Sequence, residues 1–174
     1  MKTASFIALL LAVLPALLAE EPSLDPNLEP LRPFLGSWRG EFKNSTPEKP
    51  IVDTSLWERA LNGKAIRIVH SINDGAYGGE TLVTWDAEKK SIVYHYFSTA
   101  GFRTEGTMKA AGKKLECHEV VIGSIGAATE VKSTFELSDD KTFRTESTYL
   151  KDGKPQGTRE VTYKRADGAK PVFK

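Results

Sequence analysis

The sequence predicts an all-β protein, a single antiparallel up-and-down β-barrel of about ten strands with a short helical turn on its N-terminal side. Three observations predict this fold. Turn-forming residues recur after Gly36 at intervals of about 12 to 15 residues, which leaves strands of about eight to ten residues. Apolar and polar side chains alternate along most of these strands, as in sheets with one buried face. No connection is long enough for a crossover helix, so neighbouring strands must pair antiparallel.

The connections between the expected strands are rich in glycine, asparagine and aspartate, which favour tight turns. They lie at residues 44–50, 62–63, 74–79, 86–90, 100–101, 111–112, 123–126, 138–141 and 152–153. Strands of this length and regularity favour a barrel over a sandwich of short strands. Before the first strand, residues 27–34 (NLEPLRPF) predict one helical turn that packs Leu28, Leu31 and Phe34 on the barrel.

The hairpin around Asn62-Gly63 sets the register of its two strands. Asn-Gly is the preferred pair for a two-residue type I′ turn, and such a turn pairs Leu61 with Lys64. One face of the hairpin then carries Glu58 opposite Arg67, a cross-strand ion pair typical of a solvent face. The other face must point inward. It mixes apolar with polar side chains, namely Asp53, Ser55, Trp57, Arg59, Ile66, Ile68, His70 and Ile72.

Other strands add polar side chains to the expected interior. Among apolar residues, their inward faces carry Thr104, Ser133, Thr145, Ser147 and Arg159. Buried hydroxyls and charges need partners or water, so this composition is not that of a dry core. Barrels of more than eight strands enclose cavities, and we therefore expect a wet cavity able to hold a small molecule. The orientation of strands 91–98 and 115–122 stays open, because neither shows a clear polar face.

The first residues have the layout of a secretory signal peptide. Lys2 is a short positive region, residues 4–14 are an uncharged apolar run, and Ala19 offers a small residue for cleavage before Glu20. The uncharged stretch is short for a membrane span, and none is expected after cleavage. We expect a signal peptide at 1–19, a leader and capping turn at 20–34, the barrel at 35–166 and a C-terminal tail at 167–174. The mature protein is then secreted or periplasmic.

Composition limits the classes of partner and cofactor. The chain has 24 Lys and Arg against 23 Asp and Glu, a near balance that gives no long-range attraction to nucleic acid. Three His and one Cys are too few for a typical structural metal site. Cys117 has no disulfide partner within the chain, so it is either a buried inert thiol or a reactive one. Nothing in the sequence sets the oligomeric state.

The chain carries no catalytic motif, and we name no catalytic residue. His118-Glu119 begins like a zinc-protease motif, but the second His is absent and the segment is a strand. Residues 123–126 form a turn and lack the spacing of a nucleophile elbow. The alternative, an enzyme, would use His70 with Asp53 as a general-base pair inside the cavity. It is the less favoured interpretation, because no nucleophile is evident.

The favoured interpretation is a carrier or sensor that holds a small, partly apolar ligand inside the barrel. Arg59 and His70 would supply the polar contacts. The apolar and aromatic contacts would come from Trp57, Ile68, Tyr96 and Phe102. A further alternative is a structural or partner-binding envelope protein without a ligand, which would have a filled interior and an exposed apolar patch.

Residues 35–41 (LGSWRGE) resemble the opening of nitrobindin-type, fatty-acid-binding-protein-like ten-stranded barrels, and their Gly-x-Trp is similar to the start of lipocalins and related calycins. In those families the Trp closes the barrel bottom against an Arg from the last strand. The resemblance therefore implies that Trp38 and Arg159 close this barrel. Segments 57–59, 70–81 and 96–107 are similar to a family of uncharacterised bacterial secreted proteins, and this similarity spans about residues 28–165.

The resemblance to nitrobindins does not extend to their cofactor. Nitrobindins bind ferric haem through a His close to the C-terminus, and this chain has no His after His118. We therefore predict no cofactor. A haem role would require His70, His95 or a tyrosine as the iron ligand instead.

Overall fold

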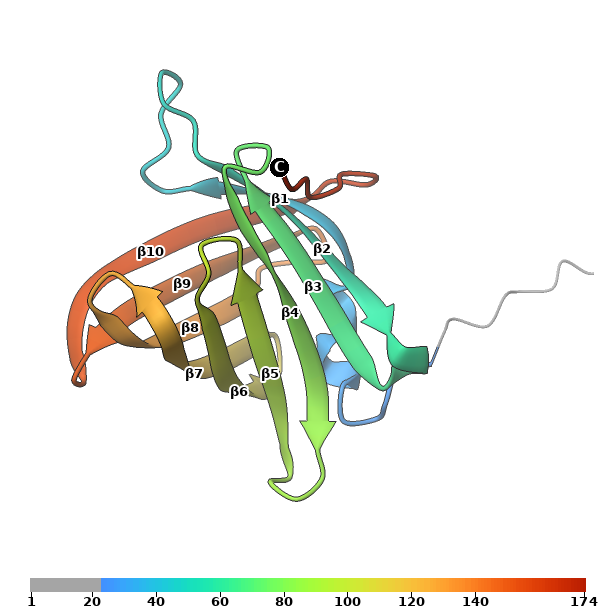
Figure 1. Cartoon of the computed structure of the whole chain (residues 1–174). Helices are drawn as coiled ribbons and strands as arrows, with labels where there is room; N and C mark the ends of the chain where they lie inside the picture. Colours follow the sequence, from blue (N-terminus) through green and yellow to red (C-terminus); the bar gives the residue numbers. More distant parts are fainter. Residues whose placement is uncertain (1–22) are drawn as a thin grey trace, which may run out of the picture.

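The computed structural model describes residues 23–174, which form one closed antiparallel barrel (Figure 1). The predicted signal peptide at 1–19 and the first residues of the predicted leader lie outside this part of the chain. Each strand pairs with its neighbours in sequence, and the last strand pairs with the first. The prediction of an all-β up-and-down barrel with a short N-terminal helical turn is confirmed.

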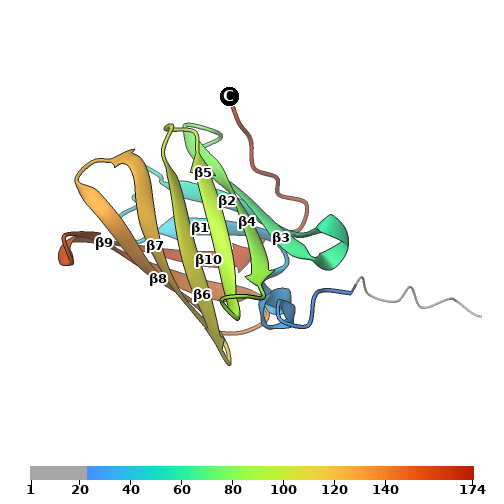
Figure 2. The ribbon, with the colours of Figure 1, turned by 60° about the horizontal axis from the view of Figure 1, so that its bottom comes forward.

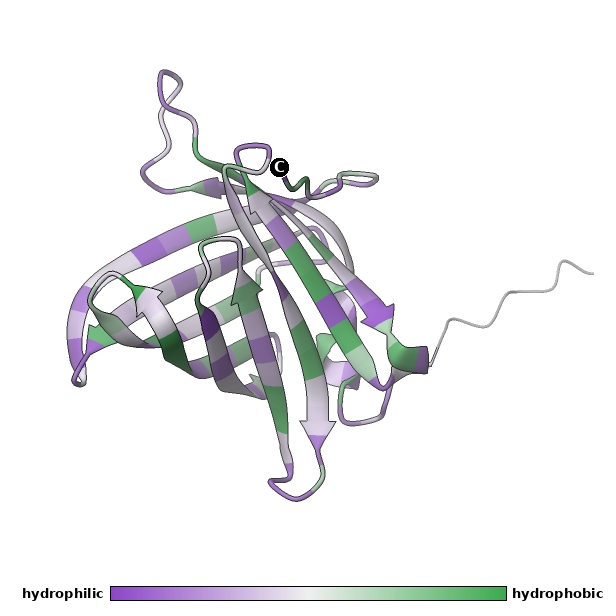
Figure 3. Cartoon of the chain, viewed as in Figure 1, coloured by the Kyte–Doolittle hydropathy of each residue, from purple (hydrophilic) through white to green (hydrophobic). Residues whose placement is uncertain are grey.

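The barrel has ten strands, and each predicted connection lies at a junction between two consecutive strands. The predicted connections at 74–79 and 123–126 were too long, because one strand already begins at Tyr77 and another continues to Ile125. Their bounds are β1 (Gly36–Phe42), β2 (Val52–Ala60), β3 (Ala65–Ile72), β4 (Tyr77–Asp86), β5 (Ser91–Ser98), β6 (Arg103–Ala111), β7 (Lys114–Ile125), β8 (Ala128–Leu137), β9 (Thr142–Lys151) and β10 (Lys154–Arg165). Two short 3-10 helices accompany them, η1 (Glu29–Phe34) and η2 (Leu61–Gly63). Apolar and polar residues alternate along the strands, as the bands in Figure 3 show.

The β2–β3 hairpin has the register predicted from its turn. Asp53 lies opposite Ile72, and Trp57 lies opposite Ile68. The turn itself is η2, where Asn62 has φ 53° and ψ 32° and Gly63 has φ 87°. These are the left-handed values that a type I′ turn requires, which explains the Asn-Gly pair. The register places the Trp57 side of the hairpin inside the barrel.

The outer face of the same hairpin carries the predicted ion pair. Arg67 Nη1 lies 2.8 Å from Glu58 Oε1, and Arg67 Nε lies 2.7 Å from Glu80 Oε1 on β4. All three side chains remain partly exposed to solvent. The polar face of β2, β3 and β4 therefore points outward, and their apolar face lines the interior.

Helix η1 closes one end of the barrel (Figure 2). Leu28 and Leu31 have no exposed surface, and Phe34 is 1% exposed. The Phe34 ring stacks on Trp57 at a centroid distance of 5.4 Å and meets the edge of Phe143 at 5.5 Å. The predicted packing of this turn on the barrel is confirmed. The apolar core accordingly gathers at the η1 end.

Trp38 seals the same end, but the arginine that covers it is not the predicted one. The Trp38 indole N–H donates to the carbonyl oxygen of Phe34 at 2.7 Å. The guanidinium carbon of Arg165 lies 3.9 Å from the Trp38 ring centroid. Arg165 also donates to the backbone carbonyl oxygens of Pro33 and Leu35. This side chain therefore fastens η1, β1 and β10 to one another.

The implied closure by Arg159 is wrong for a reason of register. Trp38 lies directly opposite Arg165 in the β1–β10 ladder. Arg159 is six residues earlier on β10, which corresponds to roughly 20 Å along a strand. Pairing with β1 reaches only to Val161, so Arg159 lies beyond the paired part of the strand. The two arginines share the inward face of β10 but occupy different ends of the interior.

The two strands whose orientation the sequence left open are now assigned. Strand β5 turns Tyr94 and Tyr96 inward and leaves His95 exposed outside. Strand β7 turns Cys117 and Glu119 inward and leaves His118 exposed outside. In residues 23–174, no helix has the length and hydropathy needed to cross a membrane.

We expect Arg165→Ala to lower the free energy of unfolding by about 1 to 3 kcal/mol, because it removes the cation–π contact with Trp38 and three hydrogen bonds to the backbone carbonyls of Pro33, Leu35 and Asp140. Urea denaturation measures this. Arg144→Ala is the matched control, since Arg144 pairs with Glu160 on the outer face and such exposed pairs contribute about 0 to 1 kcal/mol. Equal losses in the two variants would show that Arg165 is not the closing residue.

Candidate ligand-binding cavity

The barrel encloses a cavity above the apolar end formed by η1. Its volume is about 180 Å³, measured as the space open to the centres of water molecules. Every one of the ten strands contributes at least one residue to its lining. Tyr77, Ile125 and Arg159 line it beside the connections at the end opposite η1, and all three keep exposed surface. We conclude that the cavity communicates with solvent at that end.

The lower wall of the cavity is apolar and aromatic. Trp57 and Met108 are 3% and 5% exposed, and Ile68, Phe135 and Phe143 complete this wall. Phe135 meets Trp57 edge-on, with ring centroids 5.8 Å apart. Packed rings of this kind give a rigid apolar surface rather than an adaptable one. The wall suits the hydrocarbon or aromatic part of a ligand.

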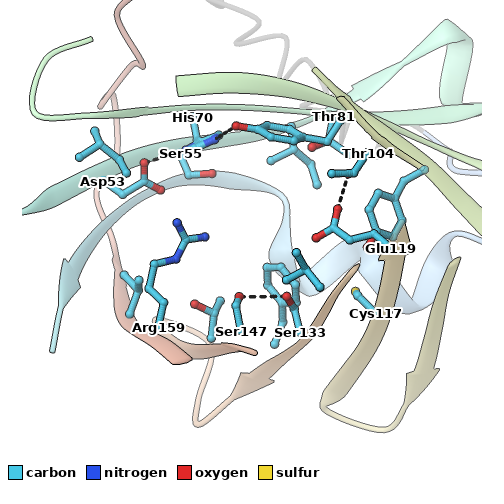
Figure 4. A pocket seen from close by; sticks show the side chains of 18 of the residues that line it. Asp53, Ser55, His70, Thr81, Thr104, Cys117, Glu119, Ser133, Ser147 and Arg159 are labelled. Atoms are coloured by element: carbon cyan, nitrogen blue, oxygen red, sulfur yellow. Dashed lines mark hydrogen bonds and ion pairs between the residues drawn. The ribbon is translucent and has the colours of Figure 1, made fainter. Parts of the chain in front are cut away.

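A chain of hydrogen bonds runs along one side of the cavity. The Tyr163 hydroxyl donates to Asp53 Oδ2 at 2.6 Å, and Asp53 Oδ1 lies 2.9 Å from His70 Nδ1. His70 Nε2 lies 3.0 Å from the Tyr96 hydroxyl, which lies 2.7 Å from the Tyr77 hydroxyl. Figure 4 shows Asp53 and His70 within this chain. Because Asp53 is 2% exposed, its two partners are what make its burial tolerable.

Two glycines allow the tyrosines to reach their partners across a strand. Gly40 on β1 lies opposite both Tyr163 of β10 and Asp53 of β2. A Cβ atom on Gly40 would stand 2.5 Å from the Tyr163 ring, so only glycine lets the ring pass over β1. Gly79 on β4 lies opposite His70 of β3, and a Cβ atom there would overlap the Tyr96 ring. The sequence thus builds the hydrogen-bond chain by omitting two side chains.

Burial fixes the protonation of these tyrosines. Desolvation, followed by the nearby Asp53 carboxylate, raises the pKa of Tyr163 well above its ordinary value. Desolvation also raises the pKa of Tyr96 and of Tyr77. The three phenols therefore stay neutral at physiological pH and act as hydrogen-bond donors. They are poor general bases, and both ring nitrogens of His70 are already engaged.

Arg159 extends into the cavity from β10 without an ionic partner. Its guanidinium group lies 5.7 Å from the ring centroids of Phe42 and Tyr149. Among residues 23–174, no side chain forms a hydrogen bond or ion pair with it. Barrel walls surround it, yet its surface stays accessible to water in the cavity. Figure 4 shows the head group pointing into the open space. It is a fixed positive charge available to a ligand.

A hydroxyl pair lies beside Arg159 on the adjoining strands. Ser147 on β9 is directly opposite Arg159 in the ladder. Ser133 Oγ on β8 donates to Ser147 Oγ at 2.9 Å, which leaves the Ser147 proton for another acceptor. Arginine and Ser147 together present several donors toward one region. Such a group of donors suits a carboxylate or another anion.

A different part of the wall carries a carboxyl group. Glu119 on β7 is bonded through Oε2 to the Thr104 hydroxyl on β6. Desolvation raises the pKa of Glu119, although the Thr104 bond opposes the shift. Beside it, burial raises the pKa of the Cys117 thiol to about 12, and this thiol is 6% exposed. Cys117 is therefore a buried thiol of low reactivity.

The structure brings most of the sequence-predicted site residues together. The residues that line the cavity are Trp57, Ile68, His70, Tyr96 and Phe102. Arg59 does not lie among them, which corrects the prediction. It continues the inward-facing series of β2 but lies past the rim at the η1 end, where its side chain is exposed. Its Nε donates to the backbone carbonyl oxygen of Ser23 at 2.6 Å, so it anchors the N-terminal segment instead.

Of the three histidines, only His70 faces the interior. His95 is exposed on the outer face of β5, and His118 lies 2.7 Å from Glu130 on the outer face of β7. Within residues 23–174, no three His, Cys, Asp or Glu side chains cluster as metal ligands do.

Sequence reasoning missed Glu119 and Tyr77 as cavity residues, and it gave Arg159 a different role. Glu119 lies on the strand whose two faces could not be told apart. In the β6–β7 ladder Glu119 lies opposite Gly106, which has the same inward parity as Thr104. Pairing β7 with β6 in the correct register could therefore have shown that Glu119 faces inward. Tyr77 lies within residues 74–79, which were predicted to be a connection, so it was not assigned to a strand face.

A scan against protein-family models found no match, and a search of curated proteins found no significant match. The functional argument therefore rests on the cavity itself.

The raised pKa of Glu119 predicts a pH-dependent stability. Its folded-state pKa exceeds the ordinary 4.5, so the contribution of the protonated form is fully present below pH 4.5 and is lost as pH rises through the folded-state pKa. Glu119→Gln remains neutral at every pH. As pH rises through that window, the free energy of unfolding of the wild type should therefore fall relative to that of Glu119→Gln. Urea denaturation at a series of pH values measures it.

The control for this experiment is Glu136→Gln on the exposed outer face of β8. Its curve is expected to follow the wild type. Parallel curves for Glu119→Gln and the wild type would contradict a raised pKa for Glu119.

Proposed function

We propose that the protein is an extracytoplasmic carrier or sensor that binds a small, partly apolar anion inside its barrel. One observation carries the proposal: the cavity holds Arg159, a fixed positive charge that no described residue pairs with. The guanidinium is reached by water in the cavity, and a ligand anion would replace that water with charge-assisted hydrogen bonds. The extracytoplasmic location rests on the signal-peptide pattern of residues 1–19.

The surroundings of Arg159 support an anionic ligand. The guanidinium lies 5.7 Å from the ring centroids of both Phe42 and Tyr149, and these cation–π contacts favour its position inside the cavity before a ligand arrives. A carboxylate could accept two parallel hydrogen bonds from the guanidinium and a third from Ser147. Preorganised donors bind more strongly because less side-chain entropy is lost on binding.

The rest of the cavity supports an apolar body on the ligand. Trp57, Ile68 and Phe135 form a wall with no charged group. Ligand sites in proteins combine such walls with a few placed polar groups, and this cavity has that composition. A partner-binding protein without a ligand would instead have a filled interior. The observed cavity favours the carrier or sensor over that alternative.

The fold is compatible with a calycin-like barrel, and we propose that the chain is a distant relative of that group. The support is the Trp38–Arg165 stack, which repeats the closure of the first-strand Trp by a last-strand Arg at a different position from the predicted one. The proposal carries no haem, because His70 has Asp53 and Tyr96 on its two ring nitrogens.

Binding of anilinonaphthalene sulfonate, a fluorescent anion with an apolar body, tests the proposal. We expect Arg159→Met to weaken binding by about tenfold or more, since hydrogen bonds to a charged group contribute about 1.5 to 3 kcal/mol. Octanoate should displace the probe from the wild type. Arg144→Met removes an exposed arginine from the outer face of β9 and should leave the affinity unchanged. Similar affinities for both variants would refute the assignment of Arg159.

A further inference from the structure

The cavity has a second polar position besides Arg159, and it bears on the class of ligand. Glu119 and Thr104 project from β7 and β6, whereas Arg159 projects from β10. Figure 4 shows the Glu119 carboxyl and the Arg159 guanidinium reaching into the cavity from opposite sides. The two side chains form no ion pair with each other, and both line the same cavity. A ligand that spans this space would meet both.

One oxygen of Glu119 is committed and the other is available. Oε2 is bonded to the Thr104 hydroxyl, and Oε1 has no protein partner. In the described part of the chain, no fully buried side-chain nitrogen or oxygen lacks a hydrogen-bond partner. Oε1 must therefore touch the open space of the cavity. This geometry offers one hydrogen-bonding atom to a ligand.

The surroundings of Glu119 favour contact with an uncharged group of the ligand. Its neighbours inside the barrel include the Tyr94 ring, Cys117 and Val131. Burial disfavours the ionised carboxylate there, and Thr104 is the only side chain that bonds to it within the described residues, although the charge of Arg159 opposes the effect of burial. A protonated carboxyl group can donate to a ligand oxygen and can also accept from a ligand hydroxyl.

We infer that the ligand is an oxygenated carboxylic acid, in which the carboxylate binds Arg159 and a distal neutral hydroxyl or carbonyl group binds Glu119. The apolar wall of Trp57, Ile68 and Phe135 contacts the hydrocarbon between these two ends. This inference rests on the proposed function, because it assumes that the cavity holds an anion. It adds a requirement for a second polar group on the same molecule.

Isothermal titration calorimetry on the mature chain tests the inference with three matched series of probes. These are hexanoate, octanoate and decanoate, their ω-hydroxy acids and their ω-amino acids. We expect the best-fitting ω-hydroxy acid to bind about fivefold more tightly than the plain acid of the same length, the gain typical of one added hydrogen bond. The ω-amino acids should bind more weakly than either, because their ammonium group would lose its hydration beside the apolar wall around Glu119.

Two variants assign the preference to Glu119. Glu119→Gln keeps both a donor and an acceptor, so it should retain the preference for the hydroxy acid. Glu119→Leu should abolish that preference, so that it binds the plain acid and the ω-hydroxy acid of one length equally well. Far-ultraviolet circular dichroism checks that each variant folds. If Glu119→Leu does not fold, the three probe series on the wild type and on Glu119→Gln still decide the question.

The outcomes separate this inference from the proposed function. Equal affinity for plain and hydroxy acids in the wild type would overturn the role of Glu119 but leave anion binding at Arg159 intact. Tighter binding of the ω-amino acids would overturn the neutral partner and indicate a charged Glu119. Failure of all three series to bind would overturn both the inference and the proposed function.

Discussion

The rest of the structure depends on the closure of the barrel between β1 and β10. This ladder removes the open sheet edges and fixes an interior that ten strands make too wide for side chains to fill. Trp38 and Arg165 stabilise the seam at one end, where η1 also packs. The apolar core is therefore confined to that end. The polar side chains in the rest of the interior must form hydrogen bonds with one another or with molecules that enter the cavity.

The polar interior divides into groups that the protein satisfies itself and groups that it leaves available. The chain from Tyr163 to Tyr77 passes through Asp53 and His70, and it is complete without a ligand. Gly40 and Gly79 make this chain possible, since each lies under a tyrosine that crosses a strand. Arg159 and one oxygen of Glu119 remain available. The cavity thus combines a complete hydrogen-bond network on one side with two polar groups, Arg159 and Glu119, that a ligand can contact.

Much of the fold could be predicted from the sequence because turns and alternation are local signals. The Asn62-Gly63 pair alone set the β2–β3 register, and with it the inward position of Asp53 and His70. The errors concern how far along the barrel axis an inward-facing residue lies, which alternation within one strand does not determine. Arg59 and Arg159 both have inward parity, but only the register across the whole barrel shows that one lies at the rim and the other within the cavity. Glu119 was missed because β7 has no polar face to orient it.

The central claim is that the cavity holds an anionic small molecule, and native mass spectrometry of the mature chain purified from its own host tests it most directly. The account predicts an additional mass that is released on denaturation and is absent from Arg159→Met prepared in the same way. A bare mass for the wild type, unchanged after incubation with host extract, would contradict it. So would an identical additional mass on the variant, since the ligand would then not depend on Arg159.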